Sequence, residues 1–185
     1  MHLPPVLSAA DLPAPELSAA RLDGELFAVG ACFAPVDEIE QPLHRAAALH
    51  AGQSGRLIAE QLSAAWVWGA LDAPPAHLQF CAATGARVSH SPARWMTVRE
   101  VVIEPDDIVA FGPALVTTPL RTVVDLVRFS STFGAREIQV VRRLGSSLED
   151  ASRLIGERRN LPNKRQALAR LRHCALPPAA PLSAE

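Results

Sequence analysis

The chain has 185 residues, of which 49% are apolar, so it can build the core of one ordinary domain and is not wholly disordered. The formal net charge is only −1, but residues 1–75 carry 3 basic and 9 acidic side chains, whereas residues 136–175 carry 10 basic and 4 acidic ones. No apolar run reaches the roughly 18 residues of a membrane span, and residues 1–20 lack the Lys or Arg of a signal peptide. We therefore expect a cytoplasmic protein that is not a membrane protein. The excess of Ala and Arg over Lys and Tyr is typical of a GC-rich bacterial genome.

The N-terminal part is predicted to contain little regular structure. Residues 1–15 include four prolines, which favour extended or turn-like backbone. A short helix is predicted over residues 16–22, and a strand or hairpin over residues 25–33 with Gly30 at the turn.

Two helices and a short strand are predicted next. Apolar residues at helical spacing predict a helix within residues 36–51, whose regular part begins near Gln41 because a proline follows at once. Residues 56–59 are predicted to form a short buried strand. A second helix is predicted over residues 61–71, with Trp66 on its buried stripe.

Residues 76–116 are rich in β-branched and aromatic side chains and predict a small sheet with hairpin-like connections. Turn-forming pairs such as Thr84-Gly85 and Gly112-Pro113 separate the apolar runs. The predicted strands are residues 77–81, 87–90, 95–98, 100–103 and 108–111.

The clearest local pattern begins at Thr118, a good N-cap, which is followed by Pro119 at the first helical position. An apolar stripe then predicts a helix that packs on the sheet. Its members are Leu120, Val123, Val124 and Val127. Arg121, Asp125 and Arg128 share an adjacent face, which we interpret as an ion pair that orients the helix rather than as a charged recognition surface.

Three more helices are predicted in the C-terminal part. One follows Gly134, with Ile138, Val141 and Leu144 facing inward. Residues 146–150 can cap the next helix, which Gly156 would end. Asn163 can cap a last helix over residues 164–173, and residues 176–185 are predicted to be a flexible tail.

The sequence contains no familiar catalytic motif. It has no phosphate-binding loop, no nucleophile elbow and no histidine pair at metal-ligand spacing, and its three cysteines are far apart. We therefore predict no catalytic, cofactor or metal residue, three buried free thiols, and a protein that acts by binding rather than as an enzyme. A nucleic-acid-processing enzyme is the less favoured alternative.

The basic C-terminal part is a candidate contact surface for nucleic acid or for an acidic protein. The opposite charges of the two halves could equally neutralise each other within the fold or across a dimer, or the basic residues could form a solvated surface. The candidate contact residues are Arg136, Arg142, Arg143, Arg158, Arg159, Lys164, Arg165, Arg170 and Arg172.

Two segments resemble motifs of the AbiEi-type antitoxins. Residues 63–69 (Ser-Ala-Ala-Trp-Val-Trp-Gly) resemble a small-residue helix of that family, and residues 116–126 resemble its V-T-x-P-x-R-T-x-x-D-L helix start. The segment at residues 24–29 is similar to the family's wing. The motif residues, which we interpret as structural, are Ser63, Ala64, Ala65, Trp66, Gly69, Thr117, Thr118, Pro119, Arg121, Thr122 and Asp125.

The resemblance, which covers residues 15–172, implies a non-enzymatic antitoxin of a type IV toxin–antitoxin system. Its partner would be a nucleotidyltransferase-like toxin, and its N-terminal winged helix would bind promoter DNA as a transcriptional regulator. The alternative is a DNA-binding repressor of its own promoter. The sequence specifies no oligomeric state.

The expected fold is α+β, in three parts. Residues 1–35 would form a truncated, degenerate winged-helix-like segment, since a complete winged helix needs about 60 residues and a basic recognition helix, and this segment is acidic. Residues 36–175 would form the antitoxin domain, a small mixed β-sheet packed with helices and followed by a helical C-terminus. Residues 176–185 would be the tail.

Overall fold

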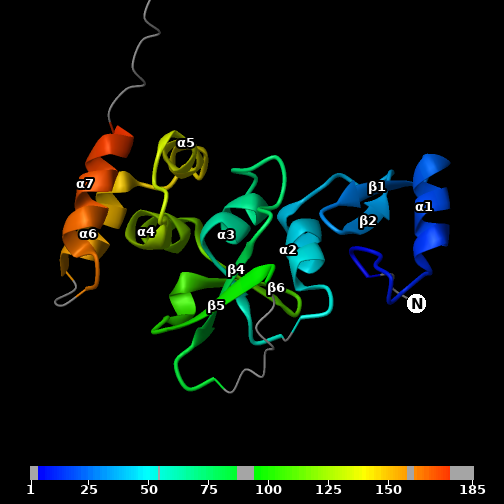
Figure 1. Cartoon of the computed structure of the whole chain (residues 1–185), viewed down its shortest axis with the longest axis horizontal. Coiled ribbons are helices and arrows are strands. Elements are labelled where there is room, and N and C mark those ends of the chain that lie inside the picture. The colour runs from blue at the N-terminus through cyan, green and yellow to red at the C-terminus, as the bar shows by residue number, and fades with distance from the viewer. Residues whose placement is uncertain (1–3, 54, 87–93, 158–160, 176–185) are drawn as a thin grey trace, which may run out of the picture.

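The computed structural model of the chain describes residues 4–53, 55–86, 94–157 and 161–175. Within these residues it forms seven α-helices, one short 3₁₀ helix, a two-stranded sheet and a five-stranded mixed sheet (Figure 1). The expected α+β class is therefore confirmed. None of the helices in the described ranges is long and apolar enough to cross a bilayer.

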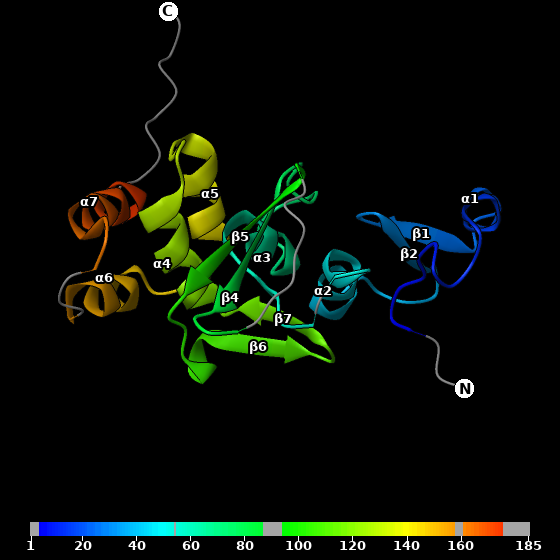
Figure 2. The same ribbon diagram turned by 60° about the horizontal axis from the view of Figure 1, so that its bottom comes forward.

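The N-terminal part consists of one helix and one hairpin. Helix α1 (Ala14–Leu22) is followed by strands β1 (Leu26–Val29) and β2 (Cys32–Pro35), which pair antiparallel. Both predicted elements are confirmed. Figure 2 shows this part at one end of the molecule, beyond α2. Gly30 has a φ of 60° at the turn, and a Cβ there would lie 3.1 Å from the Trp66 ring, so glycine lets the hairpin approach the next helices.

The next three elements contribute to the larger of two hydrophobic cores, the cluster that includes Trp66, Val67, Phe80 and Val116. Helix α2 (Pro42–His50) begins directly after Gln41, as predicted, with its proline in the first turn. Strand β3 (Ile58–Ala59) is fully buried, and α3 (Gln61–Val67) follows it. Helix α3 is shorter than predicted because Gly69, with a φ of 79°, ends it. Trp66 is only 2% exposed, as predicted.

The five-stranded sheet has the order β5-β4-β3-β7-β6. Its other strands are β4 (Leu78–Ala83), β5 (Met96–Val101), β6 (Ile108–Phe111) and β7 (Ala114–Thr117). Strand β3 pairs antiparallel with β4 and parallel with β7, and β4 and β5 are parallel.

Three details of the sheet prediction are corrected. The connection between β4 and β5 is not a hairpin, because these strands run parallel. The strands predicted at residues 95–98 and 100–103 are the single strand β5, since the pairing with β4 continues without a break. Strand β7, which forms an antiparallel hairpin with β6, was not predicted. The strand predicted at residues 87–90 lies outside the described residues.

Four helices form the opposite end of the molecule (Figures 1 and 2). They are α4 (Pro119–Phe129), α5 (Ala135–Arg143), α6 (Leu148–Glu157) and α7 (Lys164–Ala175). They enclose a second core, which α3 joins through Ala65. Val140 is more buried than the predicted Ile138, while Val141 and Leu144 are buried as predicted.

The boundaries of the last two helices differ slightly from the prediction. Helix α6 includes Gly156 and ends one residue later, and α7 continues two residues beyond His173. Asn163 directly precedes α7, and its side-chain amide donates to the carbonyl of Arg128, 3.1 Å away. Its φ of 61° is one that asparagine tolerates better than most residues. The predicted tail lies outside the described residues.

Candidate functional site

The two motif segments contact each other at the junction of α3 and α4. The indole Nε1 of Trp68 donates to the carbonyl oxygen of Thr117 at 2.8 Å. On the other side of α3, the Ser63 hydroxyl accepts from the backbone N–H of Gln79 at 2.8 Å, which fastens the helix to β4. The remaining small residues of this motif, Ala64 and Ala65, are fully buried.

The start of α4 is fixed by hydroxyl groups. The Thr118 hydroxyl accepts from the backbone N–H of Arg121 at 3.2 Å, so Thr118 is the predicted N-cap, and Pro119 occupies the first turn. The hydroxyls of Thr117 and Thr122 lie 2.7 Å apart in the interior. Each of these contacts orders the strand-to-helix turn, which is a structural role.

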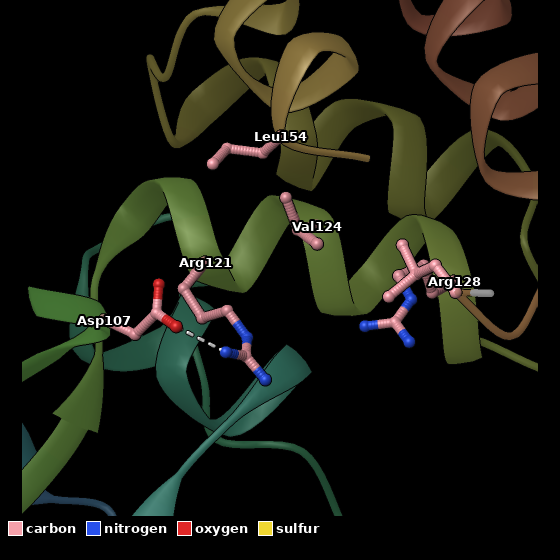
Figure 3. Close-up of a pocket in the computed structure, with 6 residues that line it drawn as sticks. Asp107, Arg121, Val124, Arg128 and Leu154 are labelled. Carbon is pink, nitrogen blue, oxygen red and sulfur yellow. Dashed lines mark hydrogen bonds and ion pairs between the residues drawn. The ribbon is translucent and has the colours of Figure 1, made fainter. Parts of the chain in front are cut away.

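Arg121 contacts Asp125 on its own helix, Asp107 and the carbonyl of Val102. Figure 3 shows the pair with Asp107. Its Nε lies 2.8 Å from Oδ2 of Asp125, and its Nη1 lies 2.5 Å from Oδ2 of Asp107. Its Nη2 donates to the carbonyl oxygen of Val102 at 3.4 Å. The pairing predicted within α4 is therefore present, and it extends to the 3₁₀ helix (Pro105–Asp107) that precedes β6.

The cavity beside this cluster is too small for a ligand. Its volume is about 10 Å³, which is room for about one water molecule. Figure 3 shows Val124 on α4 facing Leu154, with Arg121 and Arg128 at either side. The lining residues are Asp107, Arg121, Val124, Arg128, Leu154 and Leu161.

A second, larger pocket of about 330 Å³ lies where α3 begins, between the sheet and the segment that joins α4 to α5. At its base Glu60 and Arg99 form a bidentate ion pair, with Nε 2.7 Å from Oε1 and Nη2 2.5 Å from Oε2. Glu60 is only 1% exposed. The lining residues are Glu60, Gln61, Leu62, Gln79, Thr97, Arg99, Phe129, Ser130, Ser131, Thr132, Arg136 and Glu137.

The base of this polar pocket is held rigidly. The guanidinium carbon of Arg99 lies 3.9 Å from the centre of the Phe129 ring, which is close stacking. Gln61 adopts a φ of 49°, a left-handed conformation that is costly for a residue other than glycine. Its side-chain amide donates to Oε1 of Glu60 at 3.2 Å. A strained conformation such as that of Gln61 persists only where the surrounding contacts hold the backbone in place.

Burial dominates the electrostatics of this region. Burial raises the pKa of Glu60, and the negative charge of Asp125 adds to the rise, while the hydrogen bonds and charge of Arg99 oppose it. Burial likewise raises the pKa of the Cys81 thiol, which lies next to Arg99 across the β4–β5 ladder. Within the described part of the chain, no three His, Cys, Asp or Glu side chains gather as a metal site.

Sequence analysis did not identify the polar pocket. Glu60 and Arg99 are 39 positions apart, and no local pattern connects them. The one available signal was a charged residue directly after the buried strand at residues 56–59, because a carboxylate in that position must find a partner in the fold.

The predicted basic contact residues divide into two groups. Arg142, Lys164 and Arg170 donate to backbone carbonyls of neighbouring segments, at 3.1, 2.6 and 2.9 Å, and thereby hold the C-terminal helices together. The exposed ones are Arg136, Arg143, Arg165 and Arg172. Arg158 and Arg159 lie outside the described residues.

The exposed basic residues lie in different surroundings. Arg136 lines the polar pocket, and Arg143 forms an exposed ion pair with Asp72 at 3.5 Å. Arg165 and Arg172 lie on α7.

Comparisons with known proteins bear on the fold. No family model and no curated protein matches the chain. Among solved structures, the chain is similar to that described as "Crystal structure of RV2827C protein from Mycobacterium tuberculosis", with 18% sequence identity and a TM-score of 0.51. The similarity covers 93% of this chain and 73% of the mycobacterial one. At this identity the comparison shows a shared fold.

Proposed function

We propose that the chain is a non-enzymatic AbiEi-like antitoxin that counters a nucleotidyltransferase-like toxin in the cytoplasm. The observation that carries the proposal is the contact between the two motif segments. Residues 63–69 and 116–126 are distant in sequence, yet they pack together and are joined by the hydrogen bond from Trp68 to Thr117. Because the two motifs meet at one structural junction, shared ancestry with the AbiEi-type antitoxins explains both matches better than chance does.

The motif residues act as the framework in this proposal, and the toxin is contacted elsewhere. Thr118, Arg121, Thr122 and Asp125 are occupied by contacts within the protein. The exposed cations of α5 and α7 are available for an acidic surface. We therefore assign toxin recognition to Arg136, Arg143, Arg165 and Arg172.

The experiment is toxin rescue in cells. The proposal requires a nucleotidyltransferase-like toxin gene beside the gene for this chain. That toxin is expressed from one inducible promoter and this chain from another, and growth is measured at matched soluble protein levels. Wild type should restore growth. The charge reversal Arg143→Glu/Arg172→Glu should reduce the rescue, whereas Arg94→Glu, an exposed position beside β5, should not. Failure of the wild-type chain to rescue would overturn the proposal.

A repressor role is the second candidate. It is favoured by the helix and hairpin of residues 14–35, which resemble part of a winged helix. The charge of this part opposes it, because Asp11, Glu16, Asp23 and Glu25 outnumber Arg21, whereas DNA-binding elements are basic. Retardation of the chain's own promoter fragment distinguishes this role from the first.

A further inference from the structure

The buried charges of the polar pocket are already paired with groups of the protein. Glu60 is bound by Arg99 through two hydrogen bonds, and Oε2 of Glu137 accepts from the backbone N–H of Gly134 at 2.9 Å. A small ion that entered the base of the pocket would have to displace one of these partners. A neutral ligand with hydrogen-bond donors and acceptors can bind without displacing the partners of Glu60 or Glu137.

The other polar groups of the pocket are amides and hydroxyls. The Gln79 side-chain oxygen accepts from the backbone N–H of Leu62 at 2.9 Å, which fixes the orientation of this amide. Among the described residues no acceptor is present for its NH₂ end, so that end can donate to a ligand. The hydroxyl-bearing residues between α4 and α5 that line the pocket are Ser130, Ser131 and Thr132.

The pocket carries one flat polar group, the Arg99 guanidinium. It lies over the Phe129 ring, whose centre is also 4.4 Å from the guanidinium carbon of Arg128, and Leu62 adds an apolar contact. Aromatic rings and guanidinium planes are the groups on which proteins stack unpaired bases, whose edges are read by amides and hydroxyls. A volume of about 330 Å³ lies within the usual range for small-ligand sites.

One exposed cation completes the arrangement. Arg136, in the first turn of α5, lines the same pocket, and a guanidinium is well suited to bind phosphate. We propose that this pocket binds one nucleotide unit, with the base against Arg99, Leu62 and Gln79 and the phosphate at Arg136. The unit is either a free nucleoside monophosphate or the end nucleotide of an RNA strand, which present the same chemistry.

The test is titration calorimetry of the purified chain with AMP, GMP, CMP and UMP. At least one of them should bind saturably below about 1 mM with one site per chain. Its nucleoside should bind about tenfold more weakly, because the contact with Arg136 is missing. Inorganic phosphate should not bind. A tetranucleotide ending in the preferred base distinguishes the two sources: tighter binding than the monophosphate identifies a strand end, and equal or weaker binding identifies the free nucleotide.

Two variants locate the ligand. Arg136→Ala should weaken nucleotide binding about tenfold and leave nucleoside binding unchanged. Arg143→Ala, an exposed arginine on the same helix, is the matched control and should bind as wild type does. Ser131→Trp places a large side chain at an exposed position of the lining and should abolish binding with an unchanged melting temperature.

The proposal is overturned if none of the nucleotides binds saturably, if phosphate alone binds as tightly as the nucleotide, or if Arg136→Ala and Ser131→Trp both bind as wild type does. This inference goes beyond the proposed antitoxin function. Because the titration uses the isolated chain without a toxin, its failure is distinguishable from a failure of toxin rescue.

Discussion

Arg121 and Asp125 form an ion pair inside the protein, with Nε 2.8 Å from Oδ2 and side chains that are 5% and 0% exposed. Arg128 lies 3.7 Å from the second carboxylate oxygen of Asp125, which has no hydrogen-bond partner among the described residues. Asp125 therefore accepts its side-chain hydrogen bond from Arg121 and has Arg128 as a second, more distant cation.

Removal of the Arg121 side chain should destabilise the fold strongly. Arg121→Ala leaves the carboxylate of Asp125 buried without its closest cation, and we expect a loss of about 3–5 kcal/mol in the free energy of unfolding. Urea denaturation measures this loss. The matched control is Arg153→Ala, which breaks an exposed ion pair with Asp150 and should cost no more than about 1 kcal/mol.

A double variant separates architecture from partner contact. Arg121→Met/Asp125→Leu removes both charges of the closest pair and should recover part of the stability that Arg121→Ala loses, because the buried carboxylate is gone. Arg128 loses its 3.7 Å contact with Asp125 but keeps its hydrogen bond to the carbonyl of Pro162. We expect both variants to rescue cells from the toxin in proportion to their folded fraction. An Arg121→Ala protein with an unchanged urea midpoint and no rescue would instead make this motif a contact surface.

Thr118→Ala should lose about 0.5–2 kcal/mol of stability, because the backbone N–H of Arg121 loses its hydroxyl acceptor at the start of α4. Thermal and urea denaturation both report this change. Ser147→Ala is a useful comparison, since its hydroxyl accepts from the backbone N–H of Asp150 at the exposed start of α6. Equal stability of Thr118→Ala and wild type would argue against the cap.

Trp66→Ala should cost about 3–5 kcal/mol, because it removes a fully buried aromatic ring from the larger core. Trp95, which is 46% exposed, provides the control, and Trp95→Ala should change the unfolding free energy by no more than about 0.5 kcal/mol. A loss below about 1 kcal/mol for Trp66→Ala would indicate that this ring faces solvent.

The isolated protein should bind its own upstream DNA weakly at about 150 mM salt, with a Kd no tighter than about 10⁻⁶ M. The reason is the acidic N-terminal part, where a DNA-binding element would need Lys and Arg to displace counterions. Fluorescence anisotropy with specific and scrambled fragments measures the affinity. Sub-micromolar binding that prefers the specific fragment would contradict this expectation and favour the repressor role.

The three cysteines should resist thiol reagents in the folded protein. Burial raises the pKa of each thiol, at Cys32, Cys81 and Cys174. A raised pKa keeps the thiol protonated at pH 8, and the reactive species is the thiolate, so labelling should be slow at pH 8 and should rise with pH. In urea all three should react at once. Complete labelling of any cysteine within mixing time in buffer would show that its burial is wrong.

Local signals in the sequence were sufficient for α4. Its cap, its first-turn proline and its apolar stripe all lie within a dozen residues, so the helix could be predicted from Thr118 onward. The sheet was less predictable because pairing partners are distant in the chain. Turn-forming residues between β4 and β5 suggest a hairpin, but the parallel pairing of these strands depends on the tertiary fold. Strand β7 is only four residues long, which leaves too short a pattern to predict it.

The polar pocket depends on distant contacts throughout. Glu60 follows β3, Arg99 is on β5, and Phe129 ends α4, so the three side chains meet only in the folded chain. The left-handed backbone of Gln61 has no sequence signal, since residues with this conformation are usually glycine or asparagine.

The two-residue strand β3 lies at the centre of the five-stranded sheet. It joins the two halves of the sheet, because Ile58 pairs with Cys81 on one side and with Leu115 on the other. The hairpin of β6 and β7 is local and can form early, whereas both ladders of β3 must first close long loops. We therefore expect the larger sheet to become continuous late in folding, when the two residues of β3 join its two halves.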